Sequence, residues 1–102
     1  MNAVYIKEFG DASKIIVGQL DKPSVKAGEV LIKTLATTIN NVDIMIRKGL
    51  YPIDAPMPFL LGRDVVGIVI DANNSAFNKG DIVWSNSLGY ENRNGASASY
   101  LA

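Results

Sequence analysis

Short runs of apolar residues, separated by Gly, Pro, Asn and Asp, follow one another along the whole chain. In residues 2–8 the apolar positions Val4 and Ile6 lie on one side, which is typical of a strand with one buried face. Residues 30–37 are rich in β-branched side chains, and residues 64–72 are apolar at most positions, which predicts a strand buried on both faces. Strands are therefore predicted at residues 2–8, 14–20, 30–37, 64–72, 82–85 and 96–101.

Near the middle of the chain the spacing of apolar residues changes to that of a helix. Apolar positions and a terminal glycine recur at Val42, Met45, Ile46 and Gly49. Asn40 or Asn41 is a suitable N-cap, and Gly49 stands where a helix is expected to end. A short helix is predicted over residues 41–48, with Asp43 and Arg47 spaced to form an ion pair along it.

The segment after this helix carries three prolines, at Pro52, Pro56 and Pro58. Each proline removes a backbone donor and disfavours helix just before it, so residues 50–60 are predicted to form an extended loop. Several short strands with frequent turns and one helix favour an all-β barrel or sandwich. A chain of 102 residues fits one domain, residues 1–102.

The composition is that of an ordinary globular protein, with 48% hydrophobic residues, 20% charged residues and a formal net charge of zero. This balance offers no electrostatic surface for nucleic acid or for an anionic membrane, so neither is expected as a partner. The apolar run 65–70 is far too short to span a bilayer, and the first residues do not resemble a secretion signal. A cytoplasmic location is expected.

The chain contains no Cys and no His. It therefore cannot form a disulfide, a thiolate nucleophile or a Ser-His pair, and it lacks the nitrogen and sulfur ligands that zinc sites use. The ten acidic residues are scattered without the spacing of a calcium loop. No metal site is expected.

Four polar residues in the middle of the chain each allow a structural and a functional interpretation. Asn40 can cap the helix or orient a substrate carbonyl or a ribose hydroxyl, and the residues alone favour the cap. Asp43 is explained by the helix dipole and by Arg47. Tyr51 can cover the proline-rich loop or line a cleft. Arg63 can pair with its neighbour Asp64, the simpler interpretation, or meet a phosphate or carboxylate.

Six short motifs in a fixed order carry a family resemblance. They are residues 1–10, AGEVLI at 27–32, NNVD at 40–43, GLYP at 49–52, GRDVVG at 62–67 and FNKGDIV at 77–83. Together they resemble the N-terminal, GroES-like domain of medium-chain dehydrogenase/reductases, most of all the quinone oxidoreductase branch. The resemblance implies a partly open β-barrel with one short helix and extends over nearly the whole chain.

The resemblance also implies roles for particular residues. Zinc-dependent members carry Cys where Asn40 stands and a His-Glu pair where Arg63 and Asp64 stand, so a zinc-free enzyme is implied. Asn40 and Tyr51 are implied as catalytic and cofactor-contacting residues and Arg63 as a further cofactor contact. We expect Asp43 and Asp64 to hold these residues in position without contacting the ligand themselves.

The function implied is the substrate side of an NAD(P)H-dependent quinone or alkenal reductase acting on a small carbonyl or quinone compound. No Gly-x-Gly-x-x-Gly occurs, so a nucleotide-binding domain is absent from these residues, and neither NADPH nor NADH is expected to bind this chain alone. A non-catalytic GroES-like binding or oligomerisation module is the alternative.

Association into a homodimer or higher oligomer is expected, because the surface meant for a second domain should be apolar and exposed. The expected contributors, some of which must also fill the core, are Val42, Met45, Ile46, Leu50, Ile53, Met57, Phe59 and Leu60.

Overall fold

The structure, a computed structural model, describes residues 1–51, 53, 56–90 and 93–102. Strands make up most of the regular secondary structure in these residues, as predicted. In chain order the elements are β1 (Asn2–Ile6), the 3-10 helix η1 (Ala12–Lys14), β2 (Ile16–Gln19), β3 (Leu31–Thr37), α1 (Asn41–Arg47), β4 (Phe59–Leu60), β5 (Val65–Asp71), β6 (Ile82–Ser85) and β7 (Tyr100–Leu101). In the part of the chain that is described, no helix is long and apolar enough to cross a membrane.

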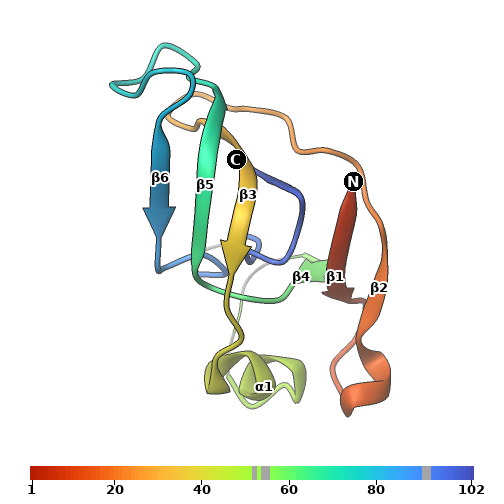
Figure 1. Ribbon diagram of the computed structural model, residues 1–102. Coiled ribbons are helices and arrows are strands. Elements are labelled where there is room, and N and C mark those ends of the chain that lie inside the picture. Colours follow the sequence, from red (N-terminus) through yellow and green to blue (C-terminus); the bar gives the residue numbers. More distant parts are fainter. Residues whose placement is uncertain (52, 54–55, 91–92) are drawn as a thin grey trace.

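The strands form two antiparallel sheets that do not close on each other (Figure 1). One sheet has the order β2-β1-β4 and the other has the order β6-β5-β3-β7. They are joined by a bridge between Ala3 and Ala98 and by backbone bonds from Val4 N to Ser97 O at 2.8 Å and from Ser99 N to Asn2 O at 3.0 Å. The predicted all-β, partly open barrel with one short helix is confirmed.

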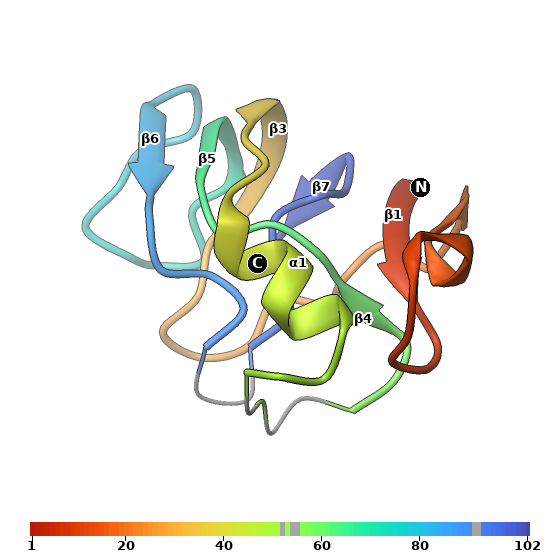
Figure 2. The same cartoon turned by 90° about the horizontal axis from the view of Figure 1, so that it is seen from below.

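Helix α1 lies at one end of the molecule, below the space between the two sheets (Figures 1 and 2). The predicted helix is confirmed, although it ends one residue earlier, at Arg47. Its inner face packs Ile46 against Ile6, Phe59 and Leu61, which are all buried. This second, smaller core cluster fixes the C-terminal part of α1 relative to β1 and the segment that leads into β5.

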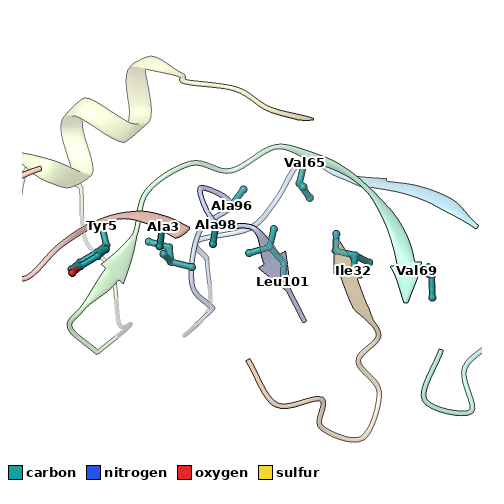
Figure 3. Packing of buried hydrophobic residues seen from close by; sticks show 9 residues of the cluster. Ala3, Tyr5, Ile32, Val65, Val69, Ala96, Ala98 and Leu101 are labelled. Atoms are coloured by element: carbon teal, nitrogen blue, oxygen red, sulfur yellow. The ribbon is translucent and has the colours of Figure 1, made fainter. Parts of the chain in front are cut away.

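The larger core cluster runs between the two sheets, as Figure 3 shows. Its buried members are Ala3, Tyr5, Ile32, Leu60, Val65, Val69, Ala96, Ala98 and Leu101. Small side chains lie where the two sheets meet, since Ala3 and Ala98 form a bridge there. Ala96 and Ala98 come from the segment before β7, so this segment closes the core between the sheets.

The prediction that residues 64–72 are buried on both faces is wrong. In β5 the burial alternates: Val65 and Val69 are almost fully buried, whereas Val66 is 39% exposed. The physical reason is the antiparallel pairing with β3 and β6, which leaves the outer face of the sheet partly in solvent.

Two strand predictions and one loop prediction also need correction at their ends. The run 14–20 begins as 3-10 helix and is a strand only in β2, and the predicted last strand over residues 96–101 is reduced to the Ala98 bridge and β7. Conversely, the predicted loop 50–60 ends in β4, because Phe59 and Leu60 pair with Ile6 and Tyr5 of β1. Such short pairings depend on distant partners and leave little periodic signal in the sequence.

Candidate functional site

Asn40 links the end of β3 to the start of α1. It is the N-cap residue with an extended backbone, and its N–H donates to Asp43 Oδ2 at 2.8 Å. Its side-chain Nδ2 donates to Asp64 Oδ2 at 2.9 Å. The N-cap position and a specific side-chain contact are thus combined in one residue.

Asp64 accepts two side-chain hydrogen bonds, from Asn40 and from Thr38 Oγ1 at 2.8 Å. The bonds from Asn40 and then Thr38, together with the nearby charge of Arg63, lower the pKa of Asp64 below its ordinary 3.8. Because a carboxylate can only accept hydrogen bonds, the NH₂ end of Asn40 must face Asp64. Among the described residues, the second N–H of the Asn40 amide donates to no protein group.

Asp64 is expected to titrate below 3.8 in the folded protein and to return toward that value in Asn40→Ala. A lowered folded-state pKa means that the ionised carboxylate stabilises the fold above the unfolded-state pKa, and that this contribution disappears as the pH falls through the folded pKa. Carboxyl-detected NMR titration measures both values, with Glu8→Gln as an exposed control. An unchanged Asp64 pKa in Asn40→Ala would refute the assignment.

Asp43 lies beneath Asn40 and is only 5% exposed. Its Oδ1 accepts from Gly62 N at 3.1 Å, so one carboxylate ties α1 to the segment that precedes β5. The predicted ion pair of Asp43 with Arg47 is wrong, because Arg47 Nη1 donates to Gly10 O at 3.0 Å. Both side chains are buried, and each is satisfied by backbone groups of other segments instead.

Arg63 does not pair with Asp64, which corrects the simpler interpretation of the sequence: among the described residues no ion pair involves Arg63. The Asp64 carboxylate accepts hydrogen bonds from Asn40 and Thr38 instead. The guanidinium carbon lies 5.9 Å from the ring centroid of Tyr51 and 5.9 Å from that of Tyr90. Arg63 therefore meets two aromatic rings.

The structure brings the candidate residues together in two groups. Hydrogen bonds join Asn40, Asp43 and Asp64, and cation–π contacts join Arg63 to Tyr51. The two groups are adjacent, because Arg63 of one and Asp64 of the other are consecutive residues. Sequence reasoning missed Tyr90, which is 52% exposed in the polar segment after β6. Its only local signal is an aromatic residue directly after a glycine in a polar loop.

A catalytic zinc ion does not fit this site. The donors here are an amide, a carboxylate and a guanidinium, and the chain has no Cys or His to supply the ligands that zinc prefers. Within the described ranges, no group of three acidic, His or Cys residues is placed to hold a metal ion. What the site offers is hydrogen bonding, positive charge and aromatic rings.

A groove of about 570 Å³ lies between β1, β2, β3 and α1, and it adjoins the site because Asp43 and Gly62 line it. Its walls are largely apolar and include Val17 and Ile39, which are 80% and 87% exposed. Of the residues expected at an apolar surface, Ile46, Phe59 and Leu60 are buried in the core, whereas Met45, Leu50 and Met57 are 43%, 64% and 37% exposed. Ile46 and Phe59 pack together in the cluster under α1, and Leu60 packs in the larger cluster between the sheets, which explains the division.

Two open antiparallel sheets with one short helix are the architecture of a GroES-like domain. The sequence model of the alcohol dehydrogenase GroES-like domain matches residues 26–101. The chain belongs to that family and, within the medium-chain dehydrogenase/reductases, to the quinone oxidoreductase branch.

Among its relatives, human quinone oxidoreductase is 37% identical over 90 residues, which is 85% of this chain and 27% of the human protein. The quinone oxidoreductase of Coxiella burnetii superposes with a TM-score of 0.87 at 25% identity, over 99% of this chain and 33% of that one. A mycobacterial protein solved with NADPH gives 0.82 at 33% identity, over 98% and 29%. The chain thus spans about a quarter to a third of these relatives.

Proposed function

We propose that this chain is the substrate-side domain of a zinc-independent, NAD(P)H-dependent oxidoreductase of the quinone or alkenal reductase type. The observation that carries the proposal is the Asn40–Asp64 hydrogen bond, which fixes the Asn40 amide. The family resemblance implies a metal ligand at this position in the zinc-dependent members. The likeness to a mycobacterial structure with NADPH favours that cofactor. The lack of cysteines fits a cytoplasmic location.

In this proposal the nicotinamide supplies the hydride, and the residues of this chain position the acceptor. Asn40 and Tyr51 contact the carbonyl or quinone oxygen and the cofactor, because both have a hydrogen-bonding group that can stabilise negative charge developing on oxygen. Arg63 is a further ligand contact. Asp64 and Asp43 hold Asn40 by its side chain and its backbone N–H. The second wall of the cleft comes from a nucleotide-binding domain.

Asn40→Ala and Tyr51→Phe are expected to lower turnover when this domain is joined to a nucleotide-binding domain of the same family. Loss of one well-placed hydrogen-bonding group typically costs about 10- to 1000-fold in rate, and we expect Asn40→Ala to show the larger loss. Steady-state kinetics with NADPH and a naphthoquinone measures the effect, and Lys79→Ala in an exposed turn is the control. Unchanged kinetics in both variants would favour the non-catalytic binding or oligomerisation module.

Self-association of this chain is part of the same proposal, because the groove between β1, β2, β3 and α1 has exposed apolar walls. Burial of Val17 and Ile39 in a dimer would remove this apolar surface from water. Sedimentation velocity over a range of micromolar concentrations should show a dimer or larger species, and Ile39→Glu should convert it to monomer without changing the circular dichroism spectrum. A wild-type chain that is monomeric at every concentration would contradict this expectation.

A further inference from the structure

The contacts of Arg63 hold a positive charge between two segments that are far apart in the sequence. Tyr51 follows α1, Tyr90 follows β6, and Arg63 directly precedes Asp64 at the entry to β5. The guanidinium carbon is 5.9 Å from both ring centroids. Attraction between a cation and two ring faces restricts where the guanidinium can lie. We name these three residues the arginine clamp.

The aromatic contacts leave the hydrogen-bonding capacity of Arg63 for another partner. A guanidinium carries five N–H donors in its own plane, and contact with ring faces uses none of them. The carboxylate nearest in sequence, Asp64, is directed to Asn40 and Thr38. No hydrogen bond or ion pair among the described residues uses the Arg63 side chain. Planar N–H donors on a side chain of restricted position match the paired oxygens of a carboxylate or phosphate group.

We propose that the arginine clamp is an anion-recognition site, which binds a carboxylate or phosphate group of a ligand held beside Asn40. The inference rests on the proposed function, because the clamp adjoins the Asn40–Asp64 pair at residues 63 and 64. The anionic group belongs either to an acceptor that bears a carboxylate or to a phosphate of the cofactor. In both cases Tyr90 is a positioning residue, and Arg63 contacts the ligand.

The test is an NMR titration of the ¹⁵N-labelled chain with sodium benzoate and, separately, with inorganic phosphate, at constant ionic strength. Saturable shifts are expected at Arg63 Nε and at the backbone amides of Tyr51 and Tyr90. Arg63→Gln should weaken binding by about tenfold or more, because a charge-assisted pair of hydrogen bonds is lost. Arg63→Lys keeps the charge but loses the planar donors. Its affinity for the anion should therefore lie between those of the wild type and Arg63→Gln.

Variants of Arg93 and Tyr90 distinguish anion binding at a specific site from attraction by general surface charge. Arg93→Gln removes an exposed arginine from the same segment as Tyr90 and should leave binding unchanged. Tyr90→Phe keeps the ring and should bind as the wild type does, whereas Tyr90→Ala should weaken binding about two- to fivefold. The backbone amide spectrum of each variant reports whether the fold is intact.

Saturation by benzoate supports a carboxylate-bearing acceptor, and saturation by phosphate supports a phosphate of the cofactor. Linear shifts at many basic residues, or equal binding by Arg63→Gln and wild type, mean an adventitious ion only and overturn the inference. Because the titration needs no turnover, the two proposals fail separately. Anion binding in a protein without reductase activity refutes the function alone, and Asn40-dependent turnover without anion binding refutes the clamp alone.

Discussion

Replacing Gly95 with alanine is expected to destabilise the protein severely. A Cβ atom at this buried position would lie 2.2 Å from Leu60 O, 2.5 Å from Gly62 O and 2.6 Å from Leu61 O. These atoms belong to the backbone and cannot turn away as a flexible side chain can. The strands and the segment before β7 would have to separate, at an expected cost of about 3 kcal/mol or more in the free energy of unfolding. Urea denaturation measures this loss.

Gly28→Ala is the control for Gly95→Ala. Gly28 has a φ of +84° but nothing within 4 Å of an added Cβ, so only the backbone conformation opposes the substitution. Its expected cost is about 1–2 kcal/mol. If Gly95→Ala is no less stable than Gly28→Ala, the close packing of Gly95 against these carbonyl groups is wrong.

Asp43→Ala is expected to be the second strongly destabilising substitution. It removes the acceptor of the Asn40 N–H and leaves the Gly62 N–H without a partner in a buried setting. Loss of a buried, charged acceptor shared by two donors should lower the free energy of unfolding by about 2–4 kcal/mol. Thermal and urea denaturation measure the loss, and the side-chain amide signals of Asn40 should shift because the start of α1 moves.

The control for Asp43→Ala is Glu8→Ala, which removes a carboxylate from the exposed ion pair with Lys14 at 2.9 Å. The Lys14 and Glu8 side chains are 38% and 68% exposed, so the solvent screens their attraction and the expected loss is below about 1 kcal/mol. The loss of unfolding free energy in Asp43→Asn should lie between the losses in Asp43→Ala and Glu8→Ala. The Asn amide keeps one acceptor but turns a donor toward the other N–H. Equal losses for Asp43→Ala and Glu8→Ala would contradict the buried role of Asp43.

Local patterns were enough to predict the type of most elements. The apolar spacing at Val42, Met45 and Ile46 predicted α1 because neighbours on one helix face are three or four residues apart. The β-branched runs predicted β3 and β5 for a similarly local reason. The two-residue strand β4 was missed because its pairing with Tyr5 and Ile6 joins residues more than fifty positions apart.

The candidate site was predicted only in part. Asn40 and Tyr51 were selected by the family resemblance, and the residues alone allowed a structural role for each. The hydrogen bond of Asn40 to Asp64 spans 24 positions and depends on how β5 meets the start of α1. Tyr90 carried no signal of its own, since its contact with Arg63 exists only after the segment following β6 has folded back.

By itself the sequence determined the all-β class, the short helix and a donor set without the ligands of zinc, because composition and periodicity are properties of neighbouring residues. Only the tertiary structure decided the partners of the polar side chains. Asp43 was expected to pair with Arg47 four positions away, yet it accepts from Gly62, 19 positions away. A buried side chain binds whatever donor the packing brings within reach, and that choice is made by contacts between distant segments.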